Sequence, residues 1–128
     1  MNHEALAQEM RGLREQVAGI TDTAVAAADG MLIAADTAES IDREQLAALA
    51  AAGLGLARRT ASVTGRGNFS RTVTYGSRGC AAFYAVGDTA LVVVLGDEGL
   101  DVDRLHVATR TAVDRIQAIL AVKSPEGV

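Results

Sequence analysis

The sequence has almost no aromatic residues, and this scarcity limits how its core and any ligand site can be built. Among 128 residues there are two tyrosines, two phenylalanines and no tryptophan, although 49% of the residues are hydrophobic. The core must therefore consist mainly of Leu, Val, Ile and Ala, whose small side chains favour close contacts between backbones. The lack of aromatics, and of polar groups that converge in the sequence, argues against a small-ligand pocket.

Cysteine is also scarce, since Cys80 is the only one. It excludes an internal disulfide, which fits a reducing compartment. The first residues lack the basic and apolar segments of a signal peptide. The longest apolar run, residues 46–57, is shorter than the roughly 20 residues that span a bilayer. We therefore expect a cytoplasmic protein with one domain at 1–122 and a flexible tail at 123–128, which reaches a membrane only through partners.

Residues that could carry chemistry are few and scattered. His3, His106 and Cys80 are spaced as in no metal motif. We expect Cys80 to be a small core residue in a strand and His106 to face solvent on a helix. The carboxylates between 97 and 103 resemble a helix-capping loop more than an acid–base pair. We therefore expect no metal, no cofactor and no active site in the chain.

Negative charge is absent from a long central stretch, although the net charge is −4. No Asp or Glu lies between 45 and 87, where five arginines fall: Arg58, Arg59, Arg66, Arg71 and Arg78. Such segregation is consistent with a basic surface that meets an acidic partner, or with ordinary solvated side chains. Nucleic acid is not an expected partner, because overall basic charge and stacking aromatics are missing.

The most informative stretch is 42–65, which predicts one long helix. Asp42 followed by Gln45 is typical of a helix start, and residues 46–57 are exclusively Leu, Ala or Gly. A helix that is apolar all round is usually covered on all sides, yet a sheet in a chain this short covers only one. Gly53 and Gly55 would let a second helix backbone approach closely, or burial simply tolerates them.

Periodicity predicts amphipathic helices at 2–17 and 101–122. Five strands are expected, at 23–28, 31–35, 69–75, 80–86 and 89–95. Asp29-Gly30 predicts a hairpin with a type I′ turn between the first two. In the third, alternation places Phe69, Arg71, Val73 and Tyr75 on one face.

Together these elements predict an α+β fold with three layers, α/β/α. The uninterrupted apolar strand at 89–95 should be central, which gives an antiparallel sheet of order 2-1-5-4-3. The terminal helices then cover one face and the central helix covers the other. Strand 69–75 is left at an edge, where it can pair with another chain.

Three stretches in this order resemble the Roadblock/dynein light-chain family: Val25-Ala-Ala-Ala-Asp-Gly-Met-Leu-Ile33, the small-residue helix at 46–59, and Ala90-Leu-Val-Val-Val-Leu95. The resemblance extends from Ala5 to about Ala121 and is closest to the stand-alone bacterial type. It implies a non-enzymatic homodimer in which central helices pack together and edge strands join. It also implies a role as activator or scaffold of a small Ras-like GTPase, beside a sensor kinase-like protein.

From this resemblance and the residue pattern, the expected dimer interface consists of Leu46, Leu49, Ala50, Gly53, Leu54, Ala57, Phe69, Arg71, Val73 and Tyr75. The candidates for partner binding are Arg58, Arg59, Arg66 and Arg71, as an electrostatic rim more than as an arginine finger. The alternative function is a small-ligand sensor domain of a signalling system.

Overall fold

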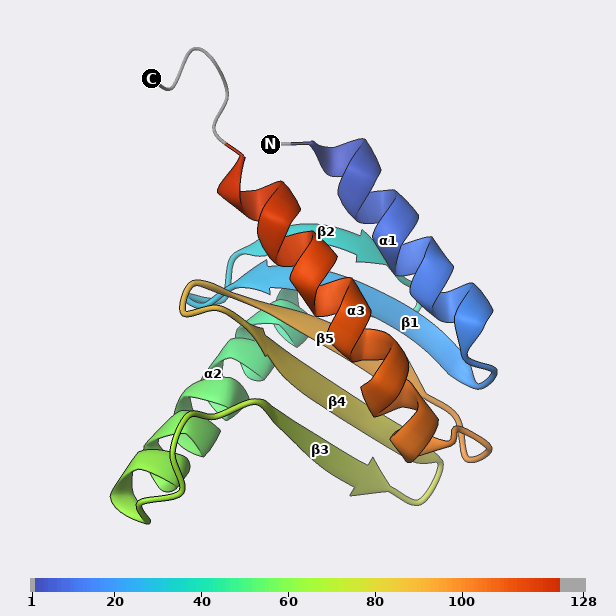
Figure 1. The fold of residues 1–128 in the computed structure, drawn as a ribbon. Helices are drawn as coiled ribbons and strands as arrows, with labels where there is room; N and C mark the ends of the chain where they lie inside the picture. Colours follow the sequence, from blue (N-terminus) through green and yellow to red (C-terminus); the bar gives the residue numbers. More distant parts are fainter. Residues whose placement is uncertain (1, 123–128) are drawn as a thin grey trace.

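The chain folds around one antiparallel sheet of five strands, with helices on both of its faces (Figure 1). The structure, a computed structural model, describes residues 2–122, so the predicted tail at 123–128 lies outside the described residues. The order of elements is the predicted one, and the α+β class is confirmed. The elements are α1 (His3–Gln16), β1 (Ile20–Ala27), β2 (Leu32–Asp36), α2 (Arg43–Val63), β3 (Arg71–Gly76), β4 (Gly79–Val86), β5 (Ala90–Gly96) and α3 (Val102–Ala121).

Side-chain caps determine where the three helices begin. Asn2, Asp42 and Asp101 each accept a hydrogen bond from the backbone N–H three residues later, at 3.0, 3.1 and 3.2 Å. A side-chain oxygen in this position satisfies an N–H that the helix start leaves unpaired, and its loss typically costs about 1 kcal/mol. All three helices begin and end within two residues of the predicted bounds.

Strand β5 lies at the centre of the sheet, as its uninterrupted apolar sequence predicted. Leu91, Val92, Val93 and Val94 are completely buried. β5 pairs with β1 on one side and with β4 on the other, which gives the predicted order β2-β1-β5-β4-β3. Because helices cover both faces, both sets of alternating side chains on β5 are apolar.

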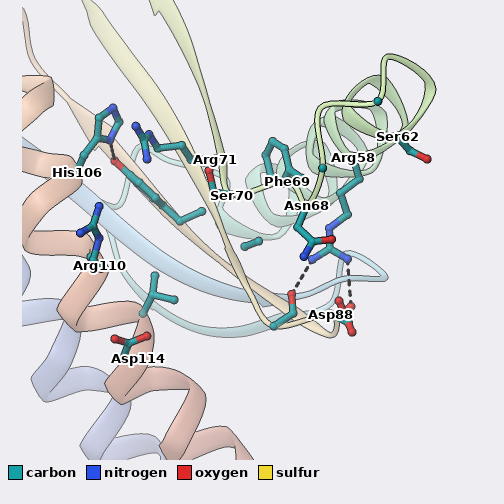
Figure 2. Close-up of a pocket in the computed structure, with 16 residues that line it drawn as sticks. Arg58, Ser62, Asn68, Phe69, Ser70, Arg71, Asp88, His106, Arg110 and Asp114 are labelled. Carbon is teal, nitrogen blue, oxygen red and sulfur yellow. Dashed lines mark hydrogen bonds between the residues drawn. The ribbon is translucent and has the colours of Figure 1, made fainter.

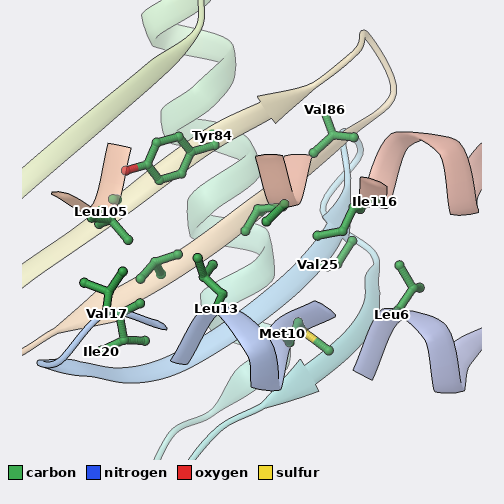
Figure 3. Packing of buried hydrophobic residues seen from close by; sticks show 14 of the residues in the cluster. Leu6, Met10, Leu13, Val17, Ile20, Val25, Tyr84, Val86, Leu105 and Ile116 are labelled. Atoms are coloured by element: carbon green, nitrogen blue, oxygen red, sulfur yellow. The ribbon is translucent and has the colours of Figure 1, made fainter. Parts of the chain in front are cut away.

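The two faces of the sheet are covered unequally. α1 and α3 lie side by side on one face, and α2 lies alone on the other (Figure 1). Under α1 and α3 the core holds long side chains such as Leu6, Met10 and Leu105 (Figure 3). Under α2 most of the buried side chains are alanines: Ala24, Ala26, Ala47, Ala50 and Ala51.

Strand β1 begins at Ile20, so the predicted start at Thr23 is wrong. The prediction followed the short apolar run that begins after Asp22, whereas the strand also includes this charged residue. In the structure Asp22 is 5% exposed, and its carboxylate accepts hydrogen bonds from the Thr21 hydroxyl at 2.7 Å and the Ala38 N–H at 2.8 Å. These bonds compensate for lost hydration and tie the loop after β2 to the sheet.

β1 and β2 form the predicted hairpin at Asp29-Gly30, but the type I′ turn is wrong. Gly30 has a φ of +95°, whereas Asp29 does not have a positive φ. The Gly30 N–H donates to the Ala27 carbonyl, and the Ala27 N–H donates to the Met31 carbonyl. This pattern is typical of a three-residue loop that ends on a left-handed glycine. The Asp29 carboxylate accepts from the Met31 N–H at 3.1 Å, which explains the aspartate.

Strand β3 starts at Arg71, and Phe69 precedes it in a loop. Phe69 packs in the layer under α2, whereas Val73 packs in the layer under α3. The prediction that these side chains share a face is wrong, because alternation holds only within a continuous strand. β3 pairs with β4 alone and is an edge strand, as predicted.

We expect two glycine-to-alanine substitutions to change stability in opposite directions. Gly79 has a φ of +141°, and an added Cβ would collide with the Gly96 carbonyl oxygen, so Gly79→Ala should lower the free energy of unfolding by roughly 1–3 kcal/mol. A Cβ at Gly12 in α1 would have no neighbour within 4 Å, so Gly12→Ala should raise it by about 0.5–1 kcal/mol. Urea unfolding measures both changes, and a Gly79→Ala variant as stable as Gly12→Ala would contradict this account.

Candidate functional site

One side of α2 carries apolar side chains that no other described part of the chain covers. Leu49, Leu56 and Val63 are 60%, 68% and 84% exposed and recur every seventh residue, which places them on one side of the helix. The opposite side packs on the sheet. The exposed residues that we call the outer face of α2 are Ala48, Leu49, Ala52, Gly55, Leu56 and Val63.

The apolar stripe from Leu49 through Ala52 to Leu56 favours contact with another protein, and the exposed Arg59 and Thr60 separate Val63 from it. Single exposed leucines are common on protein surfaces, but continuous apolar patches mark interaction sites. Burying a leucine side chain fully contributes about 1.5–3 kcal/mol relative to leaving it in water. Leu49 and Leu56 therefore offer a substantial gain to any association that covers them.

Gly53 and Gly55 lie on different sides of α2. A Cβ at Gly53 would meet the Phe83 ring at 3.2 Å, so this glycine makes room for a side chain of the sheet. A Cβ at Gly55 would meet nothing within 4 Å. The predicted role of letting a second helix approach therefore fits Gly55 and not Gly53.

Strand β3 presents a second surface. One of its edges pairs with β4, from Arg71 opposite Tyr84 to Gly76 opposite Gly79. The other edge has no strand partner among residues 2–122. Its free N–H and C=O groups can pair with a strand of another chain. Tyr75, near the end of this edge, is 69% exposed.

The ten residues predicted for the dimer interface fall into three groups. Those buried inside the chain are Ala50 and Leu54. Those partly buried are Leu46, Gly53, Ala57, Phe69 and Val73. Those exposed are Leu49, Arg71 and Tyr75. Sequence reasoning missed Leu56 and Val63, although their seven-residue spacing from Leu49 was a usable signal. The interface itself stays a prediction.

The four arginines predicted to bind a partner do not form one rim. The Arg58 guanidinium donates to the carbonyl oxygens of Gly87 at 2.7 Å and Asp88 at 3.4 Å, so it ties α2 to the β4–β5 turn. Arg59 is exposed within α2, and Arg66 is exposed beyond the end of this helix. Arg71 and Arg58 line a common groove.

This groove, of 1030 Å³, extends between the end of α2, the start of β3 and α3 (Figure 2). We call it the α2–α3 groove. Its ionisable side chains come from elements that are far apart in the sequence: Arg58, Arg71, Tyr84, Asp88, His106, Arg110 and Asp114. No sequence pattern indicated that these polar groups converge. The supposed lack of converging polar groups therefore no longer argues against a ligand pocket, whereas the scarcity of aromatics still does.

His106 and Tyr84 form a pair in the groove wall. The Tyr84 hydroxyl lies 2.6 Å from His106 Nδ1, and the rings meet edge to face at 5.7 Å. Burial raises the pKa of Tyr84 to about 12, so its hydroxyl keeps its proton at neutral pH. Burial, and then the charge of Arg71, lower the pKa of His106. His106 is partly buried beside Tyr84 and lines the groove, so the expectation that it faces solvent holds only in part.

The remaining candidate chemistry is sparse. Cys80 is half-buried at the start of β4, and burial together with Asp97 raises the pKa of its thiol, which disfavours the nucleophilic thiolate. Among residues 2–122, no three His, Cys, Asp or Glu side chains lie close enough to hold a metal ion. None of the described helices has the length and apolar character needed to cross a membrane.

The sequence of this fold matches a known protein family. A family model described as the Roadblock/LC7 domain matches residues 6–96, from α1 to the end of β5. The chain belongs to the Roadblock/LC7 family. The resemblance noted in the hairpin, the small-residue helix and the Val-rich strand is thereby confirmed.

Relatives in sequence span nearly the same domain. Two uncharacterised proteins of Methanocaldococcus jannaschii are 32% and 31% identical to this Roadblock/LC7 chain over 101 residues. In both cases the aligned region covers 79% of this chain and 88% of the relative. The similarity thus extends over most of each relative.

Solved structures share the Roadblock fold at lower identity. The Roadblock/LC7 domain from Streptomyces avermitilis has a TM-score of 0.84 at 20% identity and covers 90% of this chain and 97% of its own. Myxococcus xanthus MglB has a TM-score of 0.86 at 20% identity, with 97% and 95% covered. The gliding protein MglB from Thermus thermophilus has a TM-score of 0.81 at 18% identity, with 91% and 89% covered. At these identities the similarity establishes the fold.

The folding stability should depend on pH through His106, which lies beside Tyr84. Because the pKa of His106 is lowered in the folded chain, the unfolded chain binds this proton more readily, and folding stability should fall as the pH drops below the ordinary value of 6.5. His106→Gln should remove this part of the pH dependence. His3→Gln, which alters the other histidine, should leave it unchanged. Urea unfolding between about pH 8 and pH 5 measures the difference, and equal slopes for wild type and His106→Gln would contradict it.

Proposed function

We propose that this Roadblock/LC7 protein is a non-enzymatic homodimer that regulates or scaffolds a small Ras-like GTPase. The observation that carries the proposal is the outer face of α2, where Leu49, Leu56 and Val63 remain largely exposed. A second copy of the chain is the proposed cover. A two-fold axis would bring the same apolar stripe from both copies together, so the surface is complementary to itself.

The edge strand supports the same assembly. β3 follows α2 directly in the chain, and its free edge can pair with β3 of the second copy. With a two-fold axis perpendicular to the sheet, helix packing and strand pairing can form in one association. The fold shared with MglB supports self-association, since another solved structure is described as MglB with a tetrameric arrangement (TM-score 0.83, 18% identity).

Family membership supports a signalling partner for this dimer. The resemblance implies a small Ras-like GTPase, and paired α2 helices would offer it a continuous helical platform. Arg59 and Arg66 would lie at the margins of this platform, in the stretch that contains no acidic residue. A cytoplasmic location, membrane recruitment through partners and a sensor kinase-like partner rest on the sequence and the resemblance.

Leu56→Glu should convert the dimer into a monomer. Each dimer would then have to bury two carboxylates in an apolar contact, so the dissociation constant should rise by roughly a hundredfold or more. Val107→Glu is the matched control, because Val107 is 72% exposed on α3, on the opposite face of the sheet. Light scattering at micromolar concentration reports the mass, and circular dichroism reports the fold. A wild-type monomer, or equal effects of both substitutions, would overturn the proposed interface.

The GTPase role is tested with purified small Ras-like GTPases from the same organism. We expect wild-type protein to bind one of them in at least one nucleotide state and to change its rate of GTP hydrolysis or its location. The Leu56→Glu variant should lose this effect if the dimer is the binding unit, while Val107→Glu should retain it. Calorimetry with the GDP-bound and GTP-analogue-bound forms measures binding, and an absence of binding in both states would refute the proposed role.

A further inference from the structure

We propose that the α2–α3 groove binds a phosphate group through Arg71, His106 and Arg110. The ligand would be inorganic phosphate or a phosphate monoester. This proposal is independent of the dimer and of the GTPase, because one copy of the chain supplies all three side chains.

The three side chains converge from two elements. Arg71 lies opposite Tyr84 in the β3–β4 pairing and therefore projects to the face that α3 covers. His106 and Arg110 are one turn apart on α3, so they lie on the same side of that helix. Figure 2 shows Arg71 next to His106, with Arg110 on the following turn of α3.

The two guanidinium groups are available for a ligand. Within residues 2–122, neither Arg71 nor Arg110 makes an ion pair, whereas the observed pairs are Arg14–Asp36 and Arg115–Glu9. Arg58, the other arginine of the groove, already donates to two backbone carbonyls. Guanidinium forks match the oxygens of phosphate in charge and geometry, and such charge-assisted hydrogen bonds are stronger than neutral ones.

His106 adds a donor of a different kind. Tyr84 occupies Nδ1, so Nε2 is the ring nitrogen left for a ligand. The ionisable groups around this imidazole are Tyr84, Arg71 and Arg110, with Asp103 one turn earlier on α3. With Tyr84 donating to Nδ1, the neutral ring carries its hydrogen on Nε2 and can donate it.

This donor set fits a tetrahedral phosphate better than the alternatives. A carboxylate has two oxygens and is satisfied by one guanidinium fork, whereas phosphate presents more acceptors than one fork can bind. Asp88 and Asp114 would repel a long polyanion, which restricts the anion site to the part of the groove between β3 and the α3 residues that precede Asp114. Beside the two arginines, Tyr84 offers no ring face for a nucleobase to stack on, because it is 5% exposed.

The chain has only two histidines, so imidazole NMR signals of the full-length protein test the proposal directly. Phosphate should shift the His106 signal with saturation, at a dissociation constant on the order of 1 mM, and should raise its pKa because an anion stabilises imidazolium. The His3 signal should not respond at constant ionic strength. Inorganic phosphate and O-phosphoserine, titrated separately, show which source binds more tightly.

Substitutions inside and outside the groove test whether these arginines bind the phosphate. Arg110→Gln and Arg71→Gln should each weaken phosphate binding roughly tenfold or more. Arg104→Gln, which alters an exposed arginine of α3 outside the groove, should bind like wild type. An equal response to acetate, an unchanged affinity in Arg110→Gln, or no selective shift of His106 would each overturn the proposal. Light scattering of the same samples shows whether the dimer is present, so failure here is distinct from failure of the proposed function.

Discussion

A single helix, α2, has to cover one whole face of the sheet, whereas α1 and α3 share the other face. Alanines dominate the contact, and small side chains let the helix backbone lie close to the strands. A helix held in this way buries only one stripe of its surface. Its other side is apolar, and no other part of residues 2–122 covers it. The composition of the α2 layer thus explains both the close packing on the sheet and the exposed leucines.

Most of the fold could be predicted because its signals are local or strongly patterned. The run of apolar residues in β5 was enough to place this strand between β1 and β4, and the caps marked the helix starts. Two of the errors, at Asp22 and at Asp29, come from hydrogen bonding that the sequence does not display. Asp22 belongs to β1 because Ala38 and Thr21 satisfy its carboxylate. Asp29 suits its turn because it bonds to the Met31 N–H, without a left-handed backbone.

The candidate surfaces could be predicted only in part. The sequence indicated that the sheet could not cover all of the apolar surface of α2. It did not show which residues of the helix faced the sheet and which faced outward. Gly53 and Gly55 differ by two positions and lie on different sides of the helix. The α2–α3 groove was missed because its residues are separated by up to 56 positions, from Arg58 to Asp114. The spacing of His106 and Arg110 is the one local signal that could have drawn attention to it.

Strand β3 contributes its free edge to the proposed dimer contact and Arg71 to the α2–α3 groove. Arg71 faces α3 only because it pairs opposite Tyr84, and a slip by one residue would turn it to the α2 face, away from His106. The hydrogen bonds of a further strand would lie in the plane of the sheet, whereas side chains project from its faces. Strand pairing at the free edge would therefore use the backbone of β3, whereas a ligand in the groove would contact the side chain of Arg71. The β3–β4 register is a condition for both, and neither has to displace the other.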